Sequence, residues 1–239
     1  MIQMFSLILP VYNEEHNLSR NLARIVRELS GMHEDYEIII AEDGSTDRTL
    51  HIARERSGRN PRIRVSHSDK RLGKGLAIRR AVSIASGDRM GFMDIDLSTD
   101  IRHLGKMLEC LEGHSIVIGS RMMHGSRSRR RLSRHLFSLS YNSLIRLLFR
   151  SGIRDHQCGF KGFRREAILA LAGQARNNRW FFDTELLVIA RRAGFSIKEI
   201  PVEWDEAVSS KVMSARVALQ MLTDMIRFLP RSRSLPTRK

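Results

Sequence analysis

The sequence predicts an α/β fold, a Rossmann-like and mostly parallel sheet with helices on both faces. Two observations lead to this prediction. Through the first ~120 residues, short apolar runs typical of buried strands alternate with segments of helical periodicity. The runs are apolar nearly throughout, which is typical of strands covered on both faces, as in parallel sheets. Parallel strands joined in this way are expected to follow right-handed crossovers.

The elements of this first part follow in order along the chain. Apolar runs predict strands over 5–11, 36–41, 62–66, a run ending at 93, and 115–119. Helical spacing predicts helices over 14–29, from 46 or 47 towards 57, over 73–85 and around 104–111. Pro10 falls at the end of the first strand, where its missing N–H is tolerated. Thr46 or Asp47 can cap the second helix.

The character of the chain changes after residue 121. An arginine-rich loop is expected first, then a strongly apolar helix over 132–149, an irregular strand over 157–163 and a short helix over 165–171. A further helix follows 180–187 and ends near 194. The strand over 196–204 contains Pro201, which favours an edge position. The last helix is expected over 215–229, with Pro230 ending it and a basic, mobile tail over 231–239.

The charge balance restricts the partners of this protein. Its 239 residues carry 41 Lys and Arg against 26 Asp and Glu, a formal net charge of +15. Such an excess indicates a polyanionic partner, which means nucleic acid, an anionic lipid surface or a phosphorylated substrate. The two cysteines show neither a disulfide pattern nor metal-ligand spacing, which favours a reducing compartment. We see no signal peptide, and no apolar run reaches the roughly 18 residues that span a bilayer.

Asp94 and Asp96 follow a predicted central strand directly. Ligands of open α/β sheets bind at the carboxyl ends of the strands. Side chains two residues apart share one face if the extended geometry persists. A divalent cation that holds a diphosphate is the most economical reason to place two acids there. The alternative interpretation is a solvated acidic turn that caps the next helix.

Other polar residues are predicted at the same edge of the sheet. Tyr12-Asn13-Glu14 ends the first strand and Asp43 the second, so both would face one crevice. An acid in that position can accept hydrogen bonds from a ribose or a base, although Asp before Gly44 is also an ordinary turn residue.

Further segments could bind phosphate. Gly73-Lys74-Gly75 could bring backbone amides and an ammonium to a phosphate at a helix start, but it lacks P-loop spacing. Arginine suits bidentate phosphate contact, and the alternative for an arginine run is a solvated basic loop. Asp183 and Glu185 could be helix caps. The arginines of the run are Arg121, Arg127, Arg129, Arg130, Arg131 and Arg134.

Together these motifs resemble a known family. The segments that carry the resemblance are Leu9-Pro-Val-Tyr-Asn-Glu14, Glu42-Asp-Gly-Ser-Thr-Asp47, Gly73-Lys-Gly75, Asp94-Ile-Asp96, Gly119-Ser-Arg121, Asp155-His-Gln-Cys-Gly-Phe-Lys161, Trp180-Phe-Phe-Asp-Thr-Glu-Leu-Leu187 and Ser210-Lys211. In this order they resemble the family 2 glycosyltransferases of the GT-A fold, particularly the polyprenyl-phosphate (dolichyl-phosphate) glucosyl- and mannosyltransferases. The resemblance implies a catalytic domain over 1–212, followed over 213–239 by an amphipathic helix and a basic tail at a membrane interface.

The resemblance also implies roles for particular residues. Pro10, Tyr12, Glu14 and Asp43 would hold the base and ribose, and Asp94 and Asp96 would be the metal motif, with Asp96 the ligand of Mg²⁺ or Mn²⁺. Arg121, Arg129 and Ser133 match positions that hold donor and acceptor phosphates, and Lys74 and Lys211 would lie at the diphosphate. Ser98 stands where mannosyl-transferring relatives often have a metal-binding Gln, which favours glucose over mannose and leaves Ser98 a candidate ligand. Glu42 and Ser209 replace a usual Asp and Gly.

The expected reaction is transfer of a hexose from UDP-glucose or GDP-mannose to a polyprenyl phosphate, with inversion at the sugar carbon. A phosphate monoester acceptor is already anionic near neutral pH, so it needs no strong base. The helices over 132–149 and 215–229 would lie in the membrane interface, on the cytoplasmic face. Ordinary core packing is the alternative for each helix taken singly.

Two other functions remain open from the sequence. Transfer to a sugar hydroxyl would require a base, for which Asp155, Asp183 and Glu185 are candidates. A nucleic-acid-binding module would also suit the charge, but the sequence has no nucleic-acid-binding motif, and no nucleic acid partner is expected.

Overall fold

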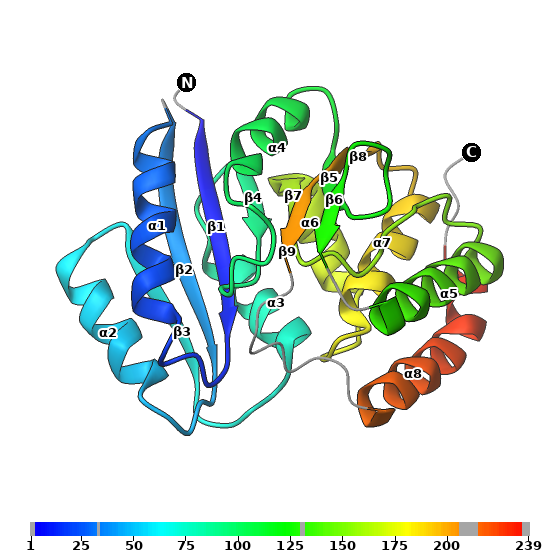
Figure 1. Ribbon diagram of the computed structural model, residues 1–239, viewed down its shortest axis with the longest axis horizontal. Helices are drawn as coiled ribbons and strands as arrows, with labels where there is room; N and C mark the ends of the chain where they lie inside the picture. The colour runs from blue at the N-terminus through cyan, green and yellow to red at the C-terminus, as the bar shows by residue number, and fades with distance from the viewer. Residues whose placement is uncertain (1–2, 33, 130–131, 206–214, 236–239) are drawn as a thin grey trace.

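The computed structural model describes residues 3–32, 34–129, 132–205 and 215–235. Seven strands form one sheet, and two short strands form a second sheet (Figure 1). In spatial order the main sheet contains β3 (Ile63–Ser68), β2 (Asp35–Asp43), β1 (Met4–Val11), β4 (Arg89–Phe92), β7 (Lys161–Arg164), β5 (Ile116–Ser120) and β8 (Ile197–Pro201). The small sheet pairs β6 (Arg127–Arg129) with β9 (Glu203–Asp205).

Helices cover both faces of the main sheet, as the sequence predicts. In chain order they are α1 (Leu18–Ser30), α2 (Thr49–Arg59), α3 (Lys74–Ile84), α4 (His103–Leu111), α5 (Leu132–Phe149), α6 (Arg165–Gln174), α7 (Phe182–Arg192) and α8 (Ala215–Arg233). Alternate strand residues enter two separate apolar clusters, one under α1, α2 and α4 and the other under α3, α6 and α7. The predicted α/β class is therefore confirmed.

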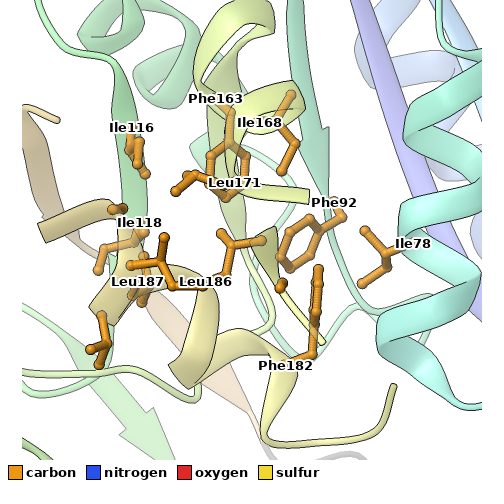
Figure 2. Close-up of a cluster of buried hydrophobic side chains, with 14 of the residues drawn as sticks. Ile78, Phe92, Ile116, Ile118, Phe163, Ile168, Leu171, Phe182, Leu186 and Leu187 are labelled. Carbon is orange, nitrogen blue, oxygen red and sulfur yellow. The ribbon is translucent and has the colours of Figure 1, made fainter. Parts of the chain in front are cut away.

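The second cluster extends outward into two further helices. Phe92 and Phe163 stack at 5.7 Å between ring centroids, among the side chains drawn in Figure 2. From that layer the apolar contacts continue to Tyr141 and Ile145 of α5 and to Met221 of α8. The two helices pack on each other and lie side by side at one end of the molecule (Figure 1). One face of each of these two helices therefore packs in the core.

Hydrophobic periodicity could not predict how strand β7 pairs with its neighbours. The strands β1 to β4 pair in parallel, but β7 runs antiparallel to both of its neighbours, β4 and β5. An apolar run gives the existence of a strand and not its direction. The predicted strand over 157–163 begins only at Lys161, because the residues before it form the loop that approaches the acid pair.

The structure corrects three other predictions. Pro230 does not end the last helix, because α8 continues to Arg233, and Arg231 is therefore helical and donates to Glu185. The segment 196–204 divides into β8 and β9, which join different sheets, and Pro201 closes the edge strand β8 as predicted. The arginine-rich loop contains the short strand β6, which pairs with β9.

Candidate active site at the carboxyl edge of the sheet

A cavity of about 640 Å³ opens at the carboxyl ends of β1, β2 and β4. Strands β2 and β3 follow one another on one side of β1, whereas β4 lies on the other side of β1. Open α/β sheets bind ligands where the strand order reverses in this way. Eight of the residues for which the sequence predicts a ligand contact line the cavity, namely Pro10, Tyr12, Glu14, Asp43, Gly73, Lys74, Asp94 and Asp96.

The end of β2 supplies an acid that is braced by the backbone. Asp43 accepts hydrogen bonds from the amides of Leu72 and Gly73, at 2.7 and 2.8 Å. Burial nevertheless raises the pKa of Asp43, while these two amides oppose the rise. Gly44 turns the chain at φ +66°, and a Cβ there would meet the backbone of Lys70 at 2.5 Å, so the turn requires glycine. The Asp-Gly turn and a ligand-facing acid therefore coexist at this position.

Tyr12 forms the outer wall of the cavity with a residue that motif comparison did not select. The guanidinium carbon of Arg71 lies 3.8 Å from the centroid of the Tyr12 ring. Tyr12 precedes Asn13, whose φ of +53° is unusual for a residue with a side chain. Such strained positions cluster at functional sites. The loop after β1 is thus bent to present Tyr12 and Glu14 to the cavity.

The acid pair lies beyond the end of β4, which stops at Phe92. Asp94, Ile95 and Asp96 all line the cavity. The extended geometry expected between the two acids does not persist, because residues 95 and 96 form a turn, closed by the Leu97 amide on the Asp94 carbonyl. The turn nevertheless brings both acids to one cavity. Burial, and then the charge of Asp94, raises the pKa of Asp96.

Neighbouring backbone holds this acid loop in place. Ser98 is not among the cavity-lining residues; its amide donates to Asp96 Oδ1 at 2.9 Å and so orients that carboxylate from behind. Leu97, with φ +53°, makes the turn between them. Gly159 lies against Asp94 so closely that a Cβ there would fall 1.9 Å from Asp94 Oδ2. A side chain at position 159 would therefore displace the Asp94 carboxylate.

Lys74 contributes an ammonium, but the surrounding amides are engaged elsewhere. Its Nζ lies 2.8 Å from Asp94 Oδ1, 3.6 Å from Asp183 Oδ2 and 5.4 Å from the Trp180 ring centroid. Burial lowers the pKa of Lys74, but the charges of Asp183 and Asp94 outweigh it and hold that pKa above its ordinary value. The Gly73 amide donates to Asp43 and the Gly75 amide to the Asn178 carbonyl. Two of the amides expected to cradle a phosphate, those of Gly73 and Gly75, therefore donate within the fold.

Arg121, Arg129 and Ser133, which the family resemblance matches to phosphate-binding positions, do not line the cavity. Arg121 makes a bidentate pair with Asp155, at 2.7 and 2.9 Å, with its side chain 10% exposed and that of Asp155 0%. Arg129 on β6 and Ser133 at the start of α5 are exposed, and none of the three lines the cavity. Lys211, Ser209, Arg130 and Arg131 lie outside the described residues.

The three candidate bases are all bound to cations inside the fold. Asp155 holds Arg121 and also accepts from the amides of Gln157 and Cys158. Asp183 holds Lys161 at 2.6 Å, and Glu185 accepts from Arg231 at 2.6 Å and from two backbone amides. None of these three carboxylates is among the residues that line the cavity.

The cavity also contains residues to which the sequence analysis gave no role. Trp180 and Arg179 come from the turn before α7, and Val217 and Gln220 come from the first turns of α8. Trp180 begins one of the segments that carry the family resemblance, and this was the signal in the sequence that could have identified it as a cavity residue. The contribution of α8 depends on how a distant helix packs, which no local pattern encodes.

Comparison with known proteins now identifies the family. The model of "Glycosyl transferase family 2" matches residues 6–171. Glycosyltransferase AglD of Haloferax volcanii is 42% identical over 93% of this chain, which spans 36% of that protein. Dolichyl-phosphate beta-glucosyltransferases of Trichomonas vaginalis and Homo sapiens are 36% and 33% identical over 93% and 94% of this chain, which spans 72% and 74% of their lengths.

Solved structures agree on the fold. Glucosyl-3-phosphoglycerate synthase of Mycobacterium tuberculosis, crystallised with Mn²⁺, UDP and phosphoglyceric acid, superposes with a TM-score of 0.72 at 21% sequence identity, covering 98% of this chain and 80% of that one. This likeness identifies the fold as GT-A. With the family model and the sequence relatives, it leads to one conclusion: the chain belongs to glycosyl transferase family 2.

Proposed function

We propose that this protein transfers glucose from UDP-glucose to a polyprenyl phosphate such as dolichyl phosphate, with inversion at the sugar carbon. One observation carries the choice of acceptor. Asp155, Asp183 and Glu185, the candidate bases for a hydroxyl acceptor, are each paired with a basic side chain, and none of the three lines the cavity. A phosphate monoester needs no such base, because it is already ionised near neutral pH. The names of the dolichyl-phosphate beta-glucosyltransferase relatives support the same acceptor and sugar.

The acid pair suits a divalent cation shared with the donor diphosphate. Among the described residues, no group of three or more His, Cys, Asp or Glu side chains is arranged to hold a metal ion. Two carboxylates completed by substrate oxygens are nevertheless the usual protein contribution to a Mg²⁺ site. The raised pKa of Asp96, caused by burial and by Asp94, indicates repulsion that a cation would relieve. Asp96, with Asp94 beside it, would hold Mg²⁺ or Mn²⁺, and the ion would stabilise charge on the leaving diphosphate.

The other cavity residues would bind and orient the donor. Tyr12 with Arg71 and the braced carboxylate of Asp43 would hold the base and ribose at the outer wall. The Lys74 ammonium lies beside Asp94, where the diphosphate would be. Its positive charge would favour departure of the nucleoside diphosphate, and its fixed position would align the sugar for in-line attack by the acceptor phosphate.

The acceptor lipid suits the apolar helices at one end of the molecule. Although α5 and α8 pack on each other and on the core, both also expose large apolar side chains: Leu132, Leu136, Leu147, Leu219 and Ile226. In the part of the chain that the structure describes, no helix is long and apolar enough to cross a bilayer. We infer that α5 and α8 rest in the interface of a membrane with anionic lipids, to which the +15 charge would attract the protein. The cavity reaches α8 at Val217 and Gln220, so a lipid-borne phosphate would approach it from that side.

A panel of radiolabelled nucleotide sugars tests the proposal. Each is incubated with the protein, dolichyl phosphate and Mn²⁺, and the lipid product is extracted. We expect label from UDP-glucose in the lipid fraction and little or none from GDP-mannose. Label in the lipid fraction only from GDP-mannose would overturn the sugar and nucleotide. Transfer only to soluble sugar hydroxyls would overturn the acceptor.

A further inference from the structure

Lys161 and Asp183 are buried charged residues that do not line the cavity. A chain of ion pairs begins at these two residues and ends at Lys74 and Asp94, which do line it. Lys161 Nζ donates to Asp183 Oδ1 at 2.6 Å, Asp183 Oδ2 lies 3.6 Å from Lys74 Nζ, and Lys74 Nζ donates to Asp94 Oδ1 at 2.8 Å. Exposure rises along the chain, from 0% for the Lys161 side chain and 5% for Asp183 to 11% for Lys74 and 44% for Asp94. The charges alternate in sign throughout.

The antiparallel strand β7 explains how a lysine comes to lie at the inner end. Lys161 is the first residue of β7 and pairs with Phe92 of β4 and Ile118 of β5, in the middle of the sheet. Its ammonium also donates to the Cys158 carbonyl. A buried ammonium is costly without a counter-charge. Asp183, in the first turn of α7, supplies that charge.

Asp183 has a second oxygen, and its position matters for the cavity. The carboxylate is anchored by Lys161 through Oδ1, which turns Oδ2 toward Lys74. Lys74 is thus shared between one anion inside the fold and one at the cavity wall. Without Asp183, a flexible lysine side chain would be held only by Asp94, which the proposed metal ion would also engage. Without Lys161, the unbalanced charge of Asp183 would draw the ammonium inward.

We propose that Asp183 and Lys161 are positioning residues that hold the Lys74 ammonium at the cavity wall for the diphosphate of the donor. The inference rests on the proposed function only in taking the donor to be a nucleotide diphosphate sugar. Asp183 acts through Lys74, and Lys161 acts through Asp183. The effect of both residues on nucleotide binding therefore depends on the presence of Lys74.

A double-mutant cycle on nucleotide affinity tests this dependence. UDP binding in the presence of Mn²⁺ is measured by calorimetry for the wild type, Asp183→Asn, Lys74→Met and the double variant, at a temperature where circular dichroism shows each to be folded. Asp183→Asn is expected to weaken UDP binding roughly ten-fold, within the range for directly coupled groups. The double variant is expected to bind no more weakly than Lys74→Met alone. Unchanged affinity in Asp183→Asn, or additive losses in the double variant, would overturn the inference.

Lys161→Met extends the test to the inner end of the chain. We expect weaker UDP binding in this variant too, and no further loss when Lys74→Met is already present. Arg89→Met is the matched control, because Arg89 is a buried cation that pairs with Glu34 at 2.6 Å at the start of β4, away from the cavity. It is expected to lower stability and leave UDP affinity unchanged. Equal losses of UDP affinity in the control and in Lys161→Met would reduce Lys161 to a structural ion pair. If Lys161→Met does not fold, the Asp183→Asn cycle decides.

The cycle and the proposed function fail in different ways. UDP binding is measured without any acceptor, so a wild type that binds UDP but glucosylates no polyprenyl phosphate contradicts the proposed function and leaves the cycle interpretable. An additive cycle in a protein that does glucosylate the lipid contradicts the positioning chain alone.

Discussion

The carboxylates on the two sides of the candidate site differ in their surroundings. On the side built by β1, β2 and β4, four acids line the cavity: Glu14, Asp43, Asp94 and Asp96. On the side built by β5, β7 and α7, three acids are buried against basic side chains: Asp155, Asp183 and Glu185. The first set lies at the cavity, whereas each acid of the second set is paired with a basic side chain and lines no part of the cavity. We therefore expect the first set to contact the substrate and its metal ion, and the second set to stabilise the fold around the cavity.

The pKa values of Asp43 and Asp96 on one side and of Asp155 on the other are shifted in opposite directions. Burial raises the pKa of Asp43 and of Asp96 in the cavity-lining set. In the balanced set, burial would raise the pKa of Asp155, but the charge and hydrogen bonds of Arg121 outweigh it and hold that pKa well below its ordinary value. A carboxylate whose charged form is disfavoured, such as that of Asp96, suits a cation that arrives with substrate. The Asp155 carboxylate does not, because Arg121 already balances its charge inside the fold.

Replacing a cavity acid should abolish chemistry and leave the fold intact. We expect Asp96→Asn to lower the initial rate of glucose transfer by about a thousand-fold or more, because the diphosphate would lose its charge stabilisation. Its thermal unfolding midpoint should stay at or above that of the wild type, since the variant removes the repulsion with Asp94. Transfer assays and calorimetric unfolding of the same preparation check both statements. Retained transfer would remove Asp96 from the site.

Replacing a balanced acid should do the reverse and damage the fold first. Asp155→Asn leaves the buried guanidinium of Arg121 without its charge partner, so we expect a loss of about 3 kcal/mol or more in the free energy of unfolding. Denaturant titration measures it. Asp100→Asn is the matched control, because Asp100 pairs with Arg102 at the surface, and about 1 kcal/mol or less is expected. Equal losses in the two variants would contradict the distinction between buried and surface pairs.

The apolar helices beside the balanced half provide a third test. We expect Leu219→Glu or Ile226→Glu, on exposed positions of α8, to weaken binding to anionic vesicles by about ten-fold, since each removes apolar area from the membrane interface. Vesicle sedimentation at low salt measures this. Leu169→Glu on α6 is the control, an exposed leucine outside α5 and α8, and should bind as the wild type does. Unchanged vesicle binding in both α8 variants would remove α8 from the interface.

The smallest expected effect is a pH dependence of stability next to Asp155. His156 is buried between Asn142 and Ser151. Burial lowers its pKa to about 3, opposed by Asp155 and assisted by Lys161. The folded protein therefore takes up this proton less readily than the unfolded chain, so stability is full above pH about 6.5 and declines as the pH falls toward 3. Between pH 6.5 and 5.5 the loss should be about 1 kcal/mol.

His156→Gln isolates that contribution from those of other groups. The variant keeps a polar side chain but does not titrate, so its free energy of unfolding should fall less steeply below pH 6.5 than that of the wild type. Chemical denaturation at several pH values gives both slopes. Parallel slopes would mean that His156 takes up its proton as readily in the folded protein as in the unfolded chain.

The cavity-lining half was largely predictable from the sequence, for a physical reason. Buried parallel strands are marked by apolar runs, and the residues that follow them must meet at one edge of the sheet. Tyr12, Asp43 and Asp96 each follow such a run and line the cavity. Lys74 was predicted as a phosphate contact because it lies in the Gly73-Lys74-Gly75 segment at a helix start, and it also lines the cavity. Its role and those of the other cavity residues stay predictions until the variants are measured.

The balanced half could not be predicted in the same way. Arg121 was expected to bind phosphate, but its partner Asp155 lies 34 positions away and becomes its neighbour only through the turn before β7. The direction of β7, which brings Lys161 between β4 and β5, is not encoded in an apolar run. The entry of α8 into the cavity wall, and its continuation through Pro230, depend on packing against α5 and α7. Long-range pairing is the information that periodicity lacks.

The configuration of the product tests the central claim most directly. If the cavity-lining acids serve the donor and no balanced acid acts as base or nucleophile, the acceptor phosphate must displace the nucleotide in a single step. Nuclear magnetic resonance of the lipid product made from UDP-glucose and a polyprenyl phosphate should then show a β-linked glucosyl phosphate. An α-linked product would contradict the account, because retention requires a step that this division of the carboxylates does not provide.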